Sequence, residues 1–253
     1  MLDLLEAEQV QQIFGATAAQ VRRDHAISHV LAALASIRAE LIFFGGTALS
    51  RTYLIRGRLS EDIDLYSRDR QSLTRELDLL PELIAQEFPQ AFWDLRPSDV
   101  IDPRSTLLVC DSAIQIQVQV LNSRSRGWNQ IPTQKSVIQR RYSDVGVTQL
   151  DVPTVDGFVA LKAVAWFERG SPRDLFDLEG LSRLGPVTKA AQDLIAELIG
   201  FQMSWEMLNR KLAGLWSEEL AHQTHLEISE AECRARVFTW WGADAGEATR
   251  RSR

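Results

Sequence analysis

The chain has 253 residues, a formal net charge of -6 and 45% hydrophobic residues. This length suits one large domain or two closely packed ones, and the composition is ordinary for a soluble globular protein. The two cysteines are distant from one another and too few for a disulfide framework. No apolar run approaches the length of a membrane span, and the acidic, amphipathic N-terminus is unlike a secretory signal. We therefore expect a cytoplasmic protein.

Residues 3 to 38 carry apolar side chains at helical spacing, which predicts two helices separated near Gly15. His25 and His29 lie four residues apart, so a helix would present both on one face, at a spacing that can hold a metal ion. The neighbouring sequence offers nothing else of a zinc site. We interpret the two histidines as surface or packing residues.

A short apolar run at residues 41–44 predicts a buried strand, which ends on Gly45 and Gly46. The segment from Thr47 to Ile55 then has helical character. A strand followed by two glycines and a helix N-terminus presents backbone N–H groups where a phosphate can approach closely. Thr47 can cap this helix or contact a phosphate, and the two roles are compatible.

Asp62 and Asp64 form an Asp-x-Asp pair in the next predicted strand. Alternate side chains of a strand share a face, so the two carboxylates converge while Ile63 and Leu65 point into the core. Adjacent unpaired carboxylates repel one another unless a cation lies between them. Mg²⁺ is the expected cation, because it prefers hard oxygen ligands and is usually held by carboxylates and substrate phosphates.

Neither feature is specific alone, because a glycine pair is often only a tight turn and an Asp-x-Asp sequence is often solvated. Their order, with Arg51, Arg56 and Arg58 between them, favours a nucleotide site. Asp62 and Asp64 are the predicted catalytic and metal-binding residues of this region. The predicted nucleotide-binding residues are Gly45, Gly46, Thr47, Arg51, Arg58 and Ser60.

Residues 71–88 have the pattern of one helix, and strands are predicted at residues 91–95, 105–111 and 113–121. In the last strand apolar residues alternate with Gln115, Gln117 and Gln119. The polar loop at residues 122–129 places Trp128 beside Arg124 and Arg126. This tryptophan could stack on a base, or it could fix the loop to the core.

Arginine is much commoner than lysine and concentrates in two segments. A local basic patch can bind phosphate backbones even on an acidic protein. Alternatively, the arginine richness reflects genome composition and solvated faces, without any ligand. The first group surrounds the Asp-x-Asp strand and consists of Arg51, Arg56, Arg58, Arg68, Arg70 and Arg75. The second follows the strand predicted at residues 113–121 and consists of Arg124, Arg126, Lys135, Arg140 and Arg141.

Residues 154–168 predict a helix that carries Lys162 among apolar neighbours, where a lysine requires either an anionic partner or a path to solvent. Ser171 and Pro172 mark the start of the next helix. Asp174 falls in its first turn, where the helix dipole favours a carboxylate, and Asp177 lies nearly one turn further on. From residue 185 onward the chain is predicted to be helical, with segments near residues 187–199, 205–215 and 228–241.

Two motifs of the chain, GGTALSR from Gly45 and RLSEDIDL from Arg58, resemble the signature of the AbiEii/MenT nucleotidyltransferase toxins. These proteins form a branch of the DNA polymerase β-like nucleotidyltransferases in bacterial type IV toxin–antitoxin and phage-defence systems. The resemblance spans roughly residues 41 to 185. It implies an α/β (α+β) fold with a nucleotidyltransferase-like mixed sheet flanked by helices.

The same resemblance implies a domain organisation and further site residues. Residues 1–150 are expected to form the nucleotidyltransferase-like domain with its N-terminal helices, and residues 151–253 a mainly helical domain. The family has a lysine followed by an R-D-x-x-D-like run, which corresponds to Lys162 and Asp177 as catalytic residues, with Asp174 as a nucleotide-binding candidate. Lys162 would contact a phosphate or the leaving group, and Asp177 would position Lys162 or the nucleotide.

Gln117 departs from the fold's usual pattern, in which the strand beside the paired aspartates supplies a third carboxylate. Two accounts remain: a metal site with two carboxylates, or a weakened enzyme. Asp111, before the same strand, is a further candidate for the missing carboxylate.

The resemblance implies a Mg²⁺-dependent toxin that transfers a nucleoside monophosphate from a nucleoside triphosphate (NTP) to an RNA 3′ end, with the tRNA acceptor stem as the expected acceptor. It also implies a cognate antitoxin protein as partner. One alternative is transfer to a protein hydroxyl. Another, which depends on Gln117, is a degenerate module that binds nucleotide or tRNA without catalysis.

Overall fold

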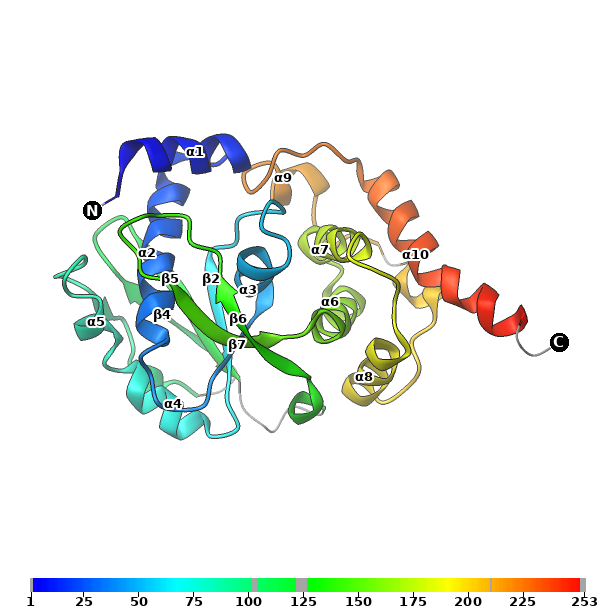
Figure 1. The fold of residues 1–253 in the computed structure, drawn as a ribbon, viewed down its shortest axis with the longest axis horizontal. Helices are drawn as coiled ribbons and strands as arrows, with labels where there is room; N and C mark the ends of the chain where they lie inside the picture. The colour runs from blue at the N-terminus through cyan, green and yellow to red at the C-terminus, as the bar shows by residue number, and fades with distance from the viewer. Residues whose placement is uncertain (1, 102–103, 122–126, 210, 251–253) are drawn as a thin grey trace. The chain divides into compact units, whose positions relative to one another are not determined.

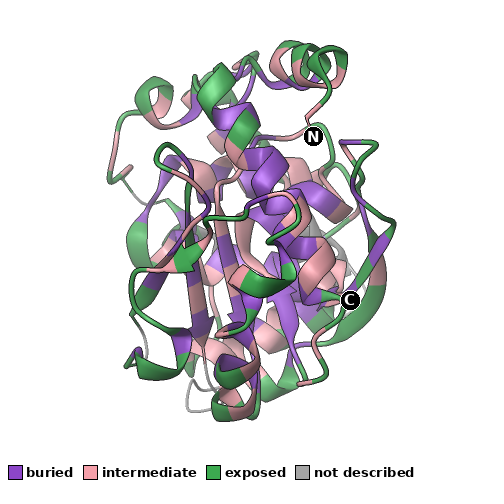
Figure 2. Cartoon of the chain, turned by 90° about the vertical axis from the view of Figure 1, so that its left-hand side faces the viewer, coloured by how far each residue is buried: buried purple, intermediate pink, exposed green. Residues whose placement is uncertain are grey.

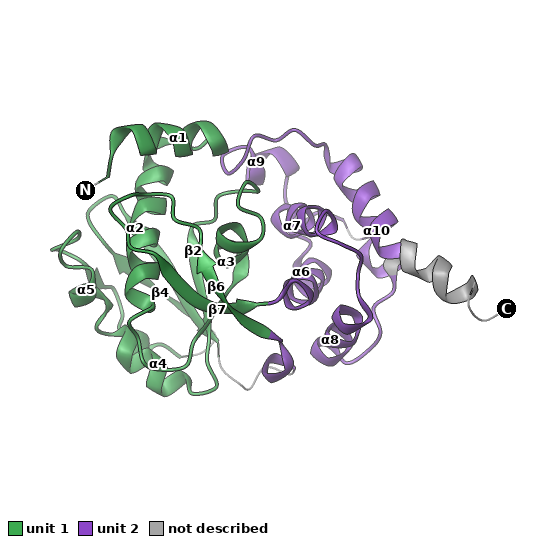
Figure 3. Cartoon of the chain, in the orientation of Figure 1, with its two compact units in different colours: residues 1–125, 133–153 green, residues 126–132, 154–253 purple. Residues whose placement is uncertain are grey.

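The computed structural model describes residues 2–101, 104–121, 127–209 and 211–250 (Figure 1). The chain divides into two compact units, which are coloured separately in Figure 3. Unit 1 comprises residues 1–125 and 133–153, and unit 2 comprises residues 126–132 and 154–253. None of the helices in the described residues combines the length and apolar character that a bilayer span requires.

The described strands of unit 1 form a five-stranded mixed sheet in the order β1-β2-β5-β4-β3 and a two-stranded antiparallel sheet of β6 and β7. Within the larger sheet β2 and β5 pair in parallel, and the other neighbours are antiparallel. The strands are β1 (Ile42–Phe44), β2 (Asp62–Tyr66), β3 (Phe92–Trp93), β4 (Ser105–Val109), β5 (Gln115–Leu121), β6 (Thr133–Ile138) and β7 (Thr148–Pro153).

The helices of unit 1 precede and connect these strands. They are α1 (Leu4–Phe14), α2 (Ala18–Leu34), α3 (Gly45–Thr52), α4 (Arg70–Leu77) and α5 (Leu80–Leu83), with a 3-10 turn η1 (Pro97–Asp99). The predicted break near Gly15 is present, since Gly15 ends α1 in the left-handed conformation with φ 63°. Thr17 and Gln20 then form a capping box that starts α2.

Unit 2 is mainly helical among its described residues. Its elements are η2 (Trp128–Gln130), α6 (Val155–Arg169), α7 (Pro172–Ser182), α8 (Lys189–Ile199), η3 (Trp205–Leu208), α9 (Trp216–Leu220) and α10 (Glu230–Arg250). Thr154 caps α6 through the backbone N–H of Gly157, and Pro172 begins α7. Trp166 is fully buried in this unit, and its indole N–H donates to the Leu208 carbonyl at 2.8 Å.

Each unit has a buried core, which Figure 2 colours purple. In unit 1 the inward-facing apolar side chains of β2 and β5 fill this core. Ile63 and Leu65 are 0% exposed, and Ile116, Val118 and Val120 are also buried. The mixed sheet and its surrounding helices confirm the predicted fold class.

Two local predictions were wrong, and two strands were missed. The helix predicted at residues 71–88 is interrupted between α4 and α5, where Pro81 lacks the N–H that a continuous helix would need. The strands β6 and β7 were not predicted; most of β6 is exposed and shows no apolar alternation, whereas β7 does alternate. The helix predicted from Trp205 to Leu215 consists only of η3, and α9 begins after Gly214.

Candidate active site

Asp62 and Asp64 lie on β2 with the alternation that the sequence predicts. Both are half-buried, whereas Ile63 between them and Leu65 after them have no exposed surface. The two carboxylates therefore share the face of β2 opposite the apolar core. Two carboxylates on one strand face supply hard oxygen donors of the kind that a divalent cation binds.

The neighbouring strand β5 presents amides to the aspartates. Gln117 is the register partner of Asp62, and Gln119 is the partner of Asp64. The position beside the aspartate pair is thus held by glutamine. Asp111 has a different role, since its Oδ1 accepts the N–H groups of Ala113 at 2.7 Å and Ile114 at 2.8 Å in the turn before β5.

The glycine pair lies directly against the acidic strand. Helix α3 begins at Gly45, two residues before the predicted start, so both glycines belong to its first turn. Gly45 has φ +78°, a conformation that other residues rarely adopt. A Cβ atom at Gly45 would lie 2.0 Å from the Asp64 Oδ2 atom, so only glycine permits this close approach.

Gly46 makes a second close approach, to Arg58 and Ser60. A Cβ atom at Gly46 would lie 2.7 Å from the Arg58 guanidinium and 2.8 Å from the Ser60 hydroxyl oxygen. Arg58 is 4% exposed and Ser60 is half-buried. The predicted residues Gly45, Gly46, Arg58, Ser60 and Asp64 are therefore brought together, with the start of a helix beside them.

Thr47 and Arg51 have structural roles that the sequence did not predict. The Thr47 side chain does not cap α3; its hydroxyl donates to the backbone carbonyl of Asp62 and joins the helix to the acidic strand. The Arg51 guanidinium is 1% exposed and donates to Asp24 Oδ1 at 2.8 Å and to the Gln139 carbonyl at 3.1 Å. In this structure Arg51 is therefore paired within unit 1.

Asp24 is the centre of a buried polar network that sequence reasoning missed. It accepts from Arg51, from Arg141 Nη1 at 2.7 Å and from the Tyr142 hydroxyl at 2.9 Å. Burial opposes its ionisation, but the two guanidiniums hold the pKa of Asp24 below its usual value. An aspartate among the apolar residues of a predicted helix was the available signal.

Several side chains of the two arginine-rich segments make structural contacts within unit 1. Arg51 and Arg58 are buried, the side chain of Arg141 is only 6% exposed, and Arg70 donates to the carbonyls of Val100 and Val120. These side chains stabilise unit 1. Arg124 and Arg126 lie outside the described residues.

In unit 2 the predicted residues form a cluster of their own. Lys162 on α6 is 5% exposed, and its Nζ lies 2.6 Å from Asp177 Oδ2 and 3.2 Å from Asp174 Oδ1. Arg169 forms a second ion pair with Asp174 at 2.6 Å. Burial would raise the pKa of Asp174, but Lys162 and Arg169 lower it to about 2. The lysine therefore has the anionic partners that its apolar surroundings require.

Comparisons with known proteins concern the family and the fold of the chain. The family model described as Nucleotidyl transferase AbiEii toxin, Type IV TA system, matches residues 29–233. The fold is similar to that of MenT4, a nucleotidyltransferase toxin from Mycobacterium tuberculosis H37Rv, with TM-score 0.67, 17% identity, and coverage of 88% of this chain and 83% of that chain.

A second solved structure has a similar fold. It is JHP933 from Helicobacter pylori, with TM-score 0.57, 14% identity, and coverage of 94% of this chain and 96% of that chain. No curated protein matches the chain. At these identities the two structures indicate a shared fold.

Proposed function

Because the chain belongs to the AbiEii nucleotidyl transferase toxin family of type IV toxin–antitoxin systems, we propose that it transfers a nucleoside monophosphate to the 3′ end of an RNA. The proposed acceptor is the acceptor end of a tRNA. The 3′-hydroxyl oxygen would attack the α-phosphorus of the NTP, the bond from that phosphorus to the β-phosphate oxygen would break, and pyrophosphate would leave. Loss of usable tRNA would arrest translation and growth, and phage defence is the proposed benefit.

The observation that best supports nucleotide binding is the close packing of two glycines against charged side chains. A Cβ at Gly45 would collide with Asp64, and one at Gly46 would collide with Arg58 and Ser60. The first turn of α3 therefore lies directly beside side chains that can bind a phosphate or its metal ion, and helix N-termini favour anions. We assign Gly45, Gly46 and Ser60 to the triphosphate, and Arg58 to the neutralisation of its charge.

The donor set on β2 fits a divalent metal ion. Asp62 and Asp64 offer carboxylate oxygens on one face, beside the amides of Gln117 and Gln119. These two aspartates would hold Mg²⁺, which when bound supplies charge neutralisation on the phosphates and favours ionisation of the attacking hydroxyl. Thr47 holds the acidic strand against α3 through the Asp62 carbonyl, so its proposed role is to position the carboxylates.

Lys162 and Asp177 are the proposed reaction residues of unit 2. The ion pair at 2.6 Å orients the Lys162 ammonium group, which supports a role for Asp177 in positioning the lysine. The proposed role of Lys162 is to neutralise charge on a phosphate or on pyrophosphate. Asp174, which binds both Lys162 and Arg169, is proposed to stabilise this arrangement rather than to contact the nucleotide.

One direct test uses the purified protein with Mg²⁺, total tRNA and each α-labelled NTP in turn, with RNA and protein resolved on separate gels. We expect label in tRNA from the preferred nucleotide, and no label with Asp64→Ala. Label only in protein would replace RNA with a protein acceptor. Nucleotide binding without any transfer would identify a binding module, the alternative that Gln117 beside Asp62 favours.

The family also implies a protein partner, since type IV toxins act with an antitoxin. We propose that a cognate antitoxin counteracts the transferase activity of this chain. Co-expression with the product of the adjacent gene, followed by the same labelling assay on cell extracts, tests this. Unchanged growth arrest and unchanged tRNA labelling in the presence of that product would contradict it.

A further inference from the structure

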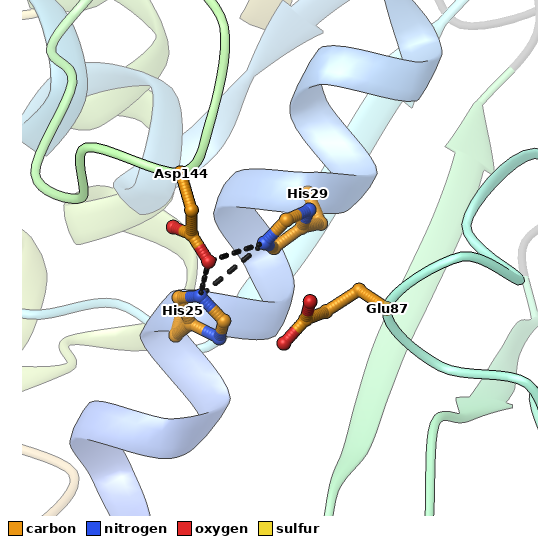
Figure 4. A group of neighbouring side chains, drawn as sticks. All are labelled: His25, His29, Glu87 and Asp144. Atoms are coloured by element: carbon orange, nitrogen blue, oxygen red, sulfur yellow. Dashed lines mark hydrogen bonds and ion pairs between the residues drawn. The ribbon is translucent and has the colours of Figure 1, made fainter. Parts of the chain in front are cut away.

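Four side chains that commonly bind metals converge in unit 1, on residues not used by the proposed transferase site. His25 and His29 come from one face of α2, Asp144 from the loop between β6 and β7, and Glu87 from the segment after α5 (Figure 4). One ligand atom of each lies within 4.8 Å of the others. Among the described residues, no other group of three or more His, Cys, Asp or Glu residues converges in this way.

Three of these atoms already have the spacing of metal ligands. The Nε2 atoms of His25 and His29 are 3.2 Å apart, and Asp144 Oδ2 lies 2.9 Å from the first and 3.5 Å from the second. In a tetrahedral site with bonds of about 2.0–2.1 Å, neighbouring ligand atoms are separated by about 3.4 Å. The triangle thus matches one face of such a site.

Hydrogen bonding alone does not account for this triangle. Each Nε2 atom carries at most one hydrogen, and the ionised carboxylate of Asp144 carries none. At most two of the three contacts can therefore be hydrogen bonds at one time. If both Nε2 atoms were protonated, the contact between His25 and His29 at 3.2 Å would bring two hydrogen-bond donors together without an acceptor between them. A cation at the centre would instead bind a lone pair from all three atoms.

The surroundings hold the ligands in place and leave a path for an ion. The ring of His25 is buried and packs edge-on against Tyr142 at 5.0 Å, and the ring of His29 packs against Phe88 at 5.8 Å. His29, Glu87 and Asp144 also line a pocket of about 420 Å³ that is partly open to solvent. A metal ion can reach the cluster through this pocket.

We propose that His25, His29 and Asp144, with Glu87 as fourth ligand, bind one divalent transition-metal ion, for which Zn²⁺ best fits the donor set. Two imidazoles with carboxylates favour zinc, whereas the carboxylate pair on β2 favours a hard cation such as Mg²⁺. The ion would join α2 to the β6–β7 loop and to the segment after α5. The side chain of Glu87 closes the remaining distance by rotation about its single bonds.

The test uses metal-stripped, tag-free full-length protein titrated with Zn²⁺ by calorimetry and with Co²⁺ by visible absorption. We expect one equivalent of Zn²⁺ to bind, with a raised melting temperature, and Co²⁺ to show the absorption of a site with nitrogen and oxygen ligands. His29→Ala and Asp144→Asn should each weaken Zn²⁺ binding by about tenfold or more. Excess Mg²⁺ should not displace the bound Zn²⁺.

The matched control is the double variant His222→Ala, His225→Ala, which removes two exposed histidines outside the cluster. It should bind Zn²⁺ like the wild type. Absence of stoichiometric Zn²⁺ binding by the wild type, or equal affinity of the wild type and a folded Asp144→Asn variant, would overturn the proposal. Circular dichroism verifies folding, and Glu87→Gln provides a variant at a half-buried position if His29→Ala does not fold.

Discussion

At the scale of single residues, Gly45 combines two demands that no other amino acid meets. Its φ of +78° is unfavourable for a side chain, and any Cβ would lie 2.0 Å from Asp64 Oδ2. A substitution must therefore move either the start of α3 or the carboxylate. The consequence is local, because Asp64 belongs to the proposed metal site.

We predict that Gly45→Ala lowers the rate of nucleotidyl transfer by about 100-fold, because a displacement of about 1 Å in a reacting site has an effect of this size. The measurement is the initial rate of label transfer to tRNA. Gly146→Ala is the control, since nothing lies within 4 Å of a Cβ there and Gly146 does not have a positive φ. Equal rates for Gly45→Ala and Gly146→Ala would contradict the proposed role of the glycine pair.

At the scale of elements, buried ion pairs hold helices together in both units. Asp24 joins α2 to α3 through Arg51, and Asp174 joins α7 to α6 through Lys162 and Arg169. Removal of one partner from such a cluster leaves charges that are neither solvated nor paired. These contacts therefore fix helix positions more strongly than exposed pairs do.

We predict that Asp174→Asn lowers the free energy of unfolding at pH 7 by about 2–3 kcal/mol. The pKa of Asp174 is lowered from 3.8 to about 2 in the folded protein. Its stabilisation is therefore fully present above about pH 4 and is lost as pH falls toward about 2. Urea unfolding of the wild type and the variant between pH 7 and pH 3 measures this difference.

The control for this prediction is Asp193→Asn, which removes an ion pair with Lys189 in the same unit. Both of those side chains are exposed, so the expected change is within about 0.5 kcal/mol at every pH. A loss for Asp174→Asn no larger than that for Asp193→Asn would refute a stabilising role of the buried cluster.

At the scale of the whole molecule, the family match at residues 29–233 includes residues of both units. The proposed reaction residues follow the same division, with Asp62 and Asp64 in unit 1 and Lys162 and Asp177 in unit 2. The proposed toxicity requires residues of both units, so an expression experiment tests all of these assignments together.

We predict that expression of the wild-type chain without its antitoxin arrests bacterial growth, and that Asp64→Ala or Lys162→Ala relieves the arrest. The physical reason is loss of the proposed metal ligand in the first variant and of the proposed phosphate-neutralising charge in the second. Growth curves at matched protein levels, verified by immunoblot, provide the measurement. Equal toxicity of all three proteins would exclude these roles.

The sequence by itself determined the features that depend on neighbouring residues. Side chains of a strand alternate between its two faces, so the sequence placed Asp62 and Asp64 on the face opposite Ile63. Gly15 separated the first two helices, and Pro172 marked the start of α7. The GGTALSR motif indicated the family, which the comparison confirms. Each of these follows from local backbone geometry or from a short motif.

Only the tertiary structure decided the contacts between residues distant in sequence. The parallel pairing of β2 with β5 placed Gln117 beside Asp62, burial assigned Arg51 to Asp24, and the β6–β7 loop brought Asp144 to His25 across 119 residues. The physical reason is that strand order and loop position result from packing of the whole core. Local propensity contains no information about which distant side chain will complete a site.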